Sequence, residues 1–95
     1  MKWVYILKCA DGSYYTGRTA NIELRLAQHQ NGQGSAWTRT RLPVRLAFSV
    51  ELPDEETAYI MEWKVKKWSR AKKEALIAGD FDLLRYLAKK PRYRK

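Results

Sequence analysis

The apolar pattern at the start of the chain predicts a β-hairpin. Residues 3–8 form a run of β-branched and aromatic side chains, which is typical of a strand. Asp11-Gly12 is a favoured hairpin-turn pair, and residues 14–18 provide the returning strand. Both alternating faces of the first strand are apolar, so we expect other elements to cover each face of the sheet.

Capping residues and prolines divide the middle of the chain. Asn21 is a favourable N-cap and Gly32 a favourable stop, which predicts a helix over about 22–31. Residues 33–43 are rich in Gly, Ser, Thr and Arg, and we expect a loop there. Prolines flank the next apolar run, which predicts a third strand over 44–52.

The remaining sequence predicts three helices, begun by Asp54, Ser69 and Asp80, with the second ending near Gly79. The apolar residues expected to face inward are Ala58, Met61, Val65 and Trp68 in the first helix and Phe81, Leu84 and Leu87 in the last. Three strands cannot bury two faces alone, so the order β-β-α-β-α-α-α predicts a small mixed α/β sandwich.

Length and composition indicate one basic domain. A chain of 95 residues is one domain long, and we assign residues 1–88 to the domain and 89–95 to a basic tail. Nineteen Lys and Arg against ten Asp and Glu leave a net charge of +9, which is typical of a protein that binds a polyanion.

The chain has one cysteine and one histidine, so neither an internal disulfide nor the usual four-ligand zinc site is expected. Cys9 ends an apolar run and is interpreted as a small core residue. The sequence shows no signal-peptide pattern and no apolar run of membrane-spanning length. A cytoplasmic monomer without membrane contact is therefore the expectation.

Two tyrosines and two residues of the first helix are candidates for chemistry. If Tyr5 and Tyr15 share a face of the hairpin, their hydroxyls can converge; the alternative is two core tyrosines bound to backbone groups. Arg25 and His29 lie four residues apart and border the buried stripe of their helix. Burying Arg25 without a partner is unfavourable, which favours a cleft that accepts an anion. For His29, a cleft and a backbone-bound core position are equally compatible.

Glu62 lies at the edge of the buried stripe of its own helix. It could form an i,i+4 ion pair with Lys66, or it could bind Mg²⁺ or Mn²⁺, because such an ion needs only one or two carboxylates beside phosphate and water. Together the candidates form a plausible phosphodiesterase site. Arg25 would stabilise transition-state charge, and a tyrosine or His29 would position or deprotonate the attacking water.

The hairpin sequence resembles the paired signature of the GIY-YIG nuclease family, in Trp3-Val4-Tyr5 and Tyr15-Thr16-Gly17. Residues 5–13 and 66–77 resemble its small stand-alone UPF0213 branch, and the likeness extends from residue 3 to residue 77. Trp3 and Thr16 depart from the usual glycine and apolar residue of the two motifs. A supporting asparagine of many relatives is not placed, since the corresponding region has Lys73-Glu74.

This resemblance implies a three-stranded antiparallel sheet flanked by helices, with a cleft on one face. It also implies one divalent metal, bound by Glu62, and a water nucleophile. Arg25 would be the family's helix arginine and His29 its additional base. Gly17 would allow close approach to the backbone, and Arg18 would contact a phosphate.

Two basic segments are candidates for holding nucleic acid. The loop residues Trp37, Arg39 and Arg41 could stack on a base and contact phosphates, although Trp37 could also cap a solvated loop. Lys66 and Lys67 belong to a basic run across a helix junction.

We expect no second domain that would recognise a base sequence. We therefore predict a DNA endonuclease that selects DNA structure, with DNA repair or recombination as its setting. The alternative is a non-catalytic DNA- or RNA-binding module on the same fold. A basic face that docks an acidic protein has no positive support.

Overall fold

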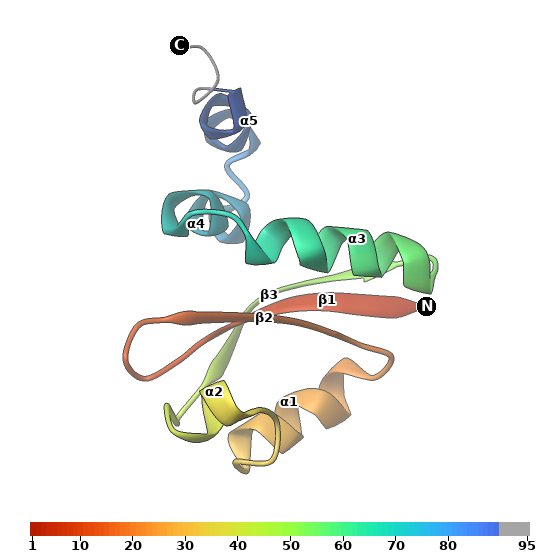
Figure 1. The fold of residues 1–95 in the computed structure, drawn as a ribbon, viewed down its shortest axis with the longest axis vertical. Coiled ribbons are helices and arrows are strands. Elements are labelled where there is room, and N and C mark those ends of the chain that lie inside the picture. The colour runs from red at the N-terminus through yellow and green to blue at the C-terminus, as the bar shows by residue number, and fades with distance from the viewer. Residues whose placement is uncertain (90–95) are drawn as a thin grey trace.

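The computed structural model describes residues 1–89 and has a three-stranded antiparallel sheet at its centre (Figure 1). The strands are β1 (Lys2–Lys8), β2 (Tyr14–Thr19) and β3 (Arg45–Leu52), in the order β2-β1-β3. The three predicted strands and the antiparallel sheet are confirmed. Because β1 is central, β2 and β3 are both edge strands.

The register places the hairpin tyrosines on one face. Tyr5 lies opposite Gly17, and Leu7 lies opposite Tyr15. Directly paired residues share a face of the sheet, so the two phenols project to the same side. Ile6 projects to the opposite side.

Helices cover both faces of the sheet (Figure 1). On the tyrosine side lie α1 (Ile22–Gln30) and the short α2 (Ala36–Arg39), and on the other side lie α3 (Glu55–Lys66) and α4 (Arg70–Ala78). The last helix, α5 (Phe81–Lys89), packs mainly on α4.

Each side of the sheet has its own core. The core on the tyrosine side consists of Tyr5, Leu7, Cys9 and Val44, against which Ile22 and Leu26 of α1 pack. The other core consists of Ile6, Val65 and Leu76, together with Phe48, Met61, Trp68 and Leu84. Both faces of β1 are covered and Cys9 is buried, as the apolar pattern of the sequence predicted.

Two sequence expectations about local structure were wrong. The loop predicted over 33–43 contains the one-turn helix α2, because the Ser35 side chain accepts the backbone N–H of Thr38 and caps it. Phe81 was expected to face inward, but it is 56% exposed at the start of α5. Leu84 does pack inward, and the side chain of Leu87 lies outside the described part.

At the end of the chain, α5 reaches one residue into the segment assigned to the tail, and residues 90–95 lie outside the described range. Among the described helices, none is long and apolar enough to cross a membrane.

Candidate active site

The Tyr5 phenol crosses the backbone of the edge strand at Gly17. A Cβ atom on Gly17 would lie 2.5 Å from the Tyr5 hydroxyl oxygen and 2.7 Å from Cζ. Only a residue without a side chain leaves this space. The group that approaches the Gly17 backbone closely is therefore the Tyr5 phenol, which reaches from the central strand to the edge of the sheet.

His29 is fully buried beneath this edge and bonded on both ring nitrogens. Its Nε2 lies 2.9 Å from the Tyr5 hydroxyl, and its Nδ1 lies 2.8 Å from the hydroxyl of Thr38 in α2. The Tyr15 ring packs against it, with centroids 5.2 Å apart, and lies 6.5 Å from the Tyr5 ring. The partners of His29 are thus side-chain hydroxyls and not the backbone groups considered from sequence.

Both buried groups are neutral at physiological pH. Burial, helped by the charge of Arg25, lowers the pKa of His29 from 6.5 to about 4. Burial also raises the pKa of the Tyr5 phenol, which the nearby Arg25 guanidinium partly opposes. A neutral imidazole has one donor and one acceptor nitrogen, so His29 donates to one hydroxyl and accepts from the other.

The depressed pKa of His29 predicts an acid-sensitive fold. Unfolded His29 binds a proton near pH 6.5, whereas folded His29 does so only near pH 4. This contribution to stability is present above pH 6.5 and is lost as the pH falls toward 4. We expect the free energy of unfolding, from urea titrations, to fall by about 1 kcal/mol between pH 7.5 and 5.5.

His29→Gln provides the control for this prediction, because His29 is the only histidine in the chain. The variant should show little change in unfolding free energy across the same pH interval. A wild-type protein whose unfolding free energy stays level from pH 7.5 to 5.5 would contradict the buried, neutral assignment.

Arg25 contributes a positive charge next to the tyrosines. Its Nη1 donates to Gln28 Oε1 at 3.1 Å, and its Nη2 donates to the Gly34 carbonyl at 3.0 Å. Both acceptors are neutral, and no carboxylate within residues 1–89 forms an ion pair with Arg25. A half-buried guanidinium without a counter-ion attracts an anion.

Gly34 is a site residue that the sequence analysis missed. A Cβ atom there would lie 1.9 Å from Nδ1 of His29, so the close packing of the imidazole depends on glycine. The Gly34 carbonyl also orients Arg25. The sequence signal for Gly34 is its position between the first helix and Ser35, in the segment predicted to be a loop.

Glu62 approaches the same edge strand from the opposite face of the sheet. It is buried at 8% exposure, and its Oε1 accepts Arg18 Nη1 at 2.5 Å while its Oε2 pairs with Lys66 Nζ at 3.0 Å. The i,i+4 pair with Lys66, considered from sequence, is therefore present.

Arg18 was expected to contact phosphate but is bound to two carboxylates. Besides Glu62 it donates from Nε to Glu55 Oε2 at 2.9 Å, and these partners raise the pKa of its guanidinium. Arg18 follows Gly17 along β2 and therefore projects to the α3 side, where Glu55 and Glu62 lie. Its charge is neutralised within the protein.

Comparison with known proteins places this arrangement in a family. Residues 1–75 match the family described as the GIY-YIG catalytic domain. The chain belongs to the GIY-YIG family. A UPF0213 protein of Natronomonas pharaonis is 44% identical over 78 residues, which cover 82% of this chain and 92% of the relative. A UPF0213 protein of Halalkalibacterium halodurans is 45% identical over 76 residues, covering 80% and 81%.

The fold of this GIY-YIG domain also has a solved counterpart. The solution NMR structure of a UPF0213 protein from Bacillus halodurans matches with a TM-score of 0.55 and 44% identity, covering 82% of this chain and 84% of that one. The family resemblance and the fold predicted from sequence are thereby confirmed. GIY-YIG domains belong to a nuclease superfamily.

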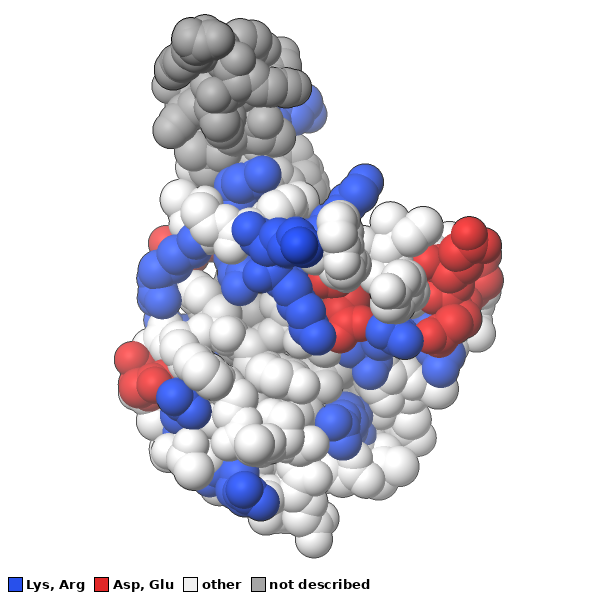
Figure 2. Space-filling view, in the orientation of Figure 1, with Lys and Arg blue, Asp and Glu red and all other residues white. Residues whose placement is uncertain are grey.

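A pocket of about 300 Å³ adjoins the edge strand of the GIY-YIG domain. It is lined by Tyr14, Tyr15, Thr16, Trp37, Lys66 and Lys73. Tyr15 is half-buried and borders this pocket, whereas Tyr5 and His29 lie beneath the surface. Burial lowers the pKa of Lys73, which belongs to the basic run predicted across the helix junction. Figure 2 shows basic side chains gathered where α3 runs into α4 and acidic ones at the start of α3.

The predicted nucleic-acid-binding loop is partly occupied by its own contacts. The Arg41 guanidinium lies 3.5 Å from the centroid of the Trp37 ring and binds Asp11 at 3.0 Å. The Trp37 indole N–H donates to Ser13 Oγ at 3.3 Å. Arg39 is exposed. Trp37 and Arg41 therefore brace α2 against the hairpin turn, and Arg39 is the loop cation that faces solvent.

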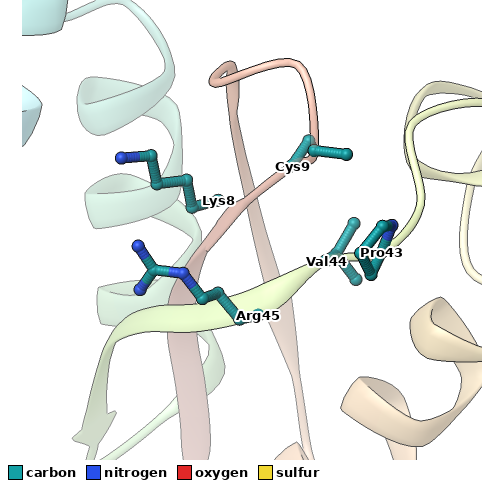
Figure 3. A pocket seen from close by; sticks show the side chains of 6 residues that line it. Lys8, Cys9, Pro43, Val44 and Arg45 are labelled. Atoms are coloured by element: carbon teal, nitrogen blue, oxygen red, sulfur yellow. The ribbon is translucent and has the colours of Figure 1, made fainter.

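A second pocket lies at the hairpin end of the sheet and involves none of the predicted site residues (Figure 3). It measures about 270 Å³ and is lined by Lys8, Cys9, Ala10, Pro43, Val44 and Arg45. Its lining offers two cations and an apolar floor.

Proposed function

We propose that this protein is a divalent-metal-dependent DNA endonuclease that selects its substrate by structure. The observation that carries the proposal is the meeting of two chemical groups at one edge strand. The neutral Tyr5–His29 pair beside Arg25 reaches β2 from one face, and the Glu62 carboxylate reaches it from the other.

Hydrolysis of a phosphodiester needs a positioned water and a group that stabilises the negative charge of the phosphorane-like transition state. Tyr15 borders the pocket and would orient the attacking water, while Tyr5 and His29 beneath it would accept or relay its proton. Arg25 would bind a non-bridging phosphate oxygen, because its protein acceptors carry no negative charge.

Glu62 is the residue that would hold the metal. Within the described residues no three His, Cys, Asp or Glu side chains cluster, so the ion would rest on one carboxylate. Mg²⁺ and Mn²⁺ fit such a site because they retain waters and bind phosphate oxygens. When bound, the ion would polarise the scissile phosphate and stabilise the leaving oxygen. One of the Glu62 contacts to Arg18 or Lys66 would have to open to admit it.

The substrate class follows from the cationic surface and the small size of the domain. Lys66 and Lys73 line the pocket beside Tyr15 and would contact the backbone of DNA. Flaps, branches, nicks or single strands are the expected substrates, and DNA repair or recombination is the expected setting.

Cleavage assays on a panel of flap, nicked, single-stranded and blunt duplex DNA with Mg²⁺ or Mn²⁺ test this proposal. We expect cutting that EDTA abolishes and that Arg25→Ala lowers by about 100-fold, the usual effect of removing one charge-stabilising donor. Arg45→Ala is the matched control, because it removes the same charge away from the site. No cutting of any substrate, or equal cutting by both variants, would refute the proposal.

One observation favours the non-catalytic alternative, namely that both Glu62 oxygens are already bound by cations. Such a module would bind DNA or RNA in a salt-sensitive manner and would show no metal-stimulated cleavage. Metal-stimulated cleavage by the wild-type protein would exclude it.

A further inference from the structure

The outer face of α3 carries two exposed aromatic side chains beside Glu62. Tyr59 is 53% exposed and Trp63 is 52% exposed, and their spacing of four residues places them on one face of the helix. Together with Ile60 and Lys64 they line a pocket of about 250 Å³, which we call the α3 slot. Neither aromatic residue was singled out from the sequence.

Each ring of the α3 slot has a cation over it. The Arg18 guanidinium lies 5.0 Å from the Tyr59 ring centroid, and Lys67 Nζ lies 4.5 Å from that of Trp63. Arg18 is also the residue that binds Glu62. Arg18 therefore contacts both Tyr59 of the slot and the proposed metal carboxylate.

The rings, together with Lys64 in the lining and Lys67 over Trp63, fit a polyanion that carries flat apolar groups. The charge of Arg18 is already neutralised by Glu55 and Glu62 and adds no phosphate contact here. Lysine and arginine bind phosphates, and exposed aromatic rings stack on bases that are not already stacked in a duplex. An apolar protein partner would gain little from the cations around the slot, in a chain whose net charge is +9.

We propose that the α3 slot binds an unpaired nucleobase next to the phosphate held at Glu62. The natural substrate then contains single-stranded DNA beside the cleavage point, which explains how this domain selects its substrate by structure. The position of the cut rests on the proposed function, whereas base binding by the slot does not.

Fluorescence anisotropy in EDTA tests base binding without cleavage. The probes are a labelled oligothymidylate, an abasic oligonucleotide of equal length, a blunt duplex and an oligouridylate. The variants are Tyr59→Ala/Trp63→Ala, the ring-preserving Tyr59→Phe/Trp63→Phe, and Phe81→Ala as an exposed aromatic control on α5.

The wild-type protein should bind oligothymidylate about 10-fold more tightly than the abasic strand, the usual size of one base–aromatic stack. The double alanine variant should lose this preference, while its affinity for the abasic strand and duplex changes less than about twofold, because it removes no charge. The phenylalanine variant should retain most of the preference, and Phe81→Ala should retain all of it. An equal loss with oligouridylate would support the slot and extend its ligand to RNA.

The proposal would be overturned if the double alanine variant lost equal affinity for base-containing and abasic strands, or lost affinity for neither. The proposal would also be overturned if the wild-type protein self-associated in sedimentation experiments and the double alanine variant did not, since a second copy would then cover the slot. A wild-type protein that shows the preference but never cuts DNA would refute the proposed function alone. If the wild-type protein cleaves DNA and the double alanine variant keeps the wild-type preference for oligothymidylate, only the proposal for the slot is refuted.

Discussion

Glu62→Gln is expected to lower the rate of DNA cleavage by about 1000-fold and, in EDTA, to tighten DNA binding. The substitution removes the carboxylate that would hold the metal, and a metal supplies several kcal/mol of transition-state stabilisation, of which about 4 kcal/mol corresponds to 1000-fold. It also releases Lys66 and removes one of the two ion pairs of Arg18, which stays bound to Glu55. A released cation can bind a phosphate, so the salt dependence of binding should steepen.

Single-turnover cleavage and fluorescence anisotropy measure these two effects on one protein preparation. Glu51→Gln is the matched control, because Glu51 is an exposed carboxylate on β3, on the other side of the central strand from β2. Its removal changes the net charge equally and should leave the cleavage rate unaltered. Normal cleavage by Glu62→Gln would mean that this carboxylate holds no ion. Binding in EDTA that is no tighter than that of Glu51→Gln would mean that Arg18 and Lys66 do not contact DNA.

The fold was largely predictable because its signals are local. The hairpin turn, the Asn21 and Asp54 caps and the stop at Gly79 each satisfy backbone groups within a few residues, and the structure contains all four. The missed helix α2 is one turn long, so it has no apolar repeat to recognise. Phe81 was misplaced because periodicity identifies an apolar stripe but does not show how far a neighbouring helix covers it.

The residues of the candidate site could be proposed from their types and spacing, but the hydrogen bonds and ion pairs between them could not. Spacing placed Arg25 and His29 on one helix face. Their partners are Gly34, in the loop after α1, and Thr38, in α2, and no local pattern determines where these two residues lie. The engagement of Arg18 by α3 depends on which helix crosses the edge strand. Long-range ion pairs of this kind are properties of the tertiary structure.

Gly17→Ala is expected to destabilise the fold and to lower the cleavage rate by about 100-fold. The new methyl group would lie 2.5 Å from the Tyr5 hydroxyl, and Tyr5 is only 1% exposed and bonded to His29. The phenol must shift, and overpacking of this kind costs about 1–3 kcal/mol in unfolding free energy. A displacement of about 1 Å in a catalytic group commonly lowers rates about 100-fold. Urea unfolding and single-turnover cleavage measure the two effects.

A double-mutant cycle with Tyr5→Leu separates this clash from a general effect on the edge strand. Leucine is too short to cross Gly17, so Gly17→Ala should lose less than half as much unfolding free energy in the Tyr5→Leu background as in the wild type. Equal losses in both backgrounds would mean that the glycine serves the strand itself. A reduced loss would show that the glycine of the second motif makes room for the tyrosine of the first, which ties the two halves of the hairpin signature to one steric requirement.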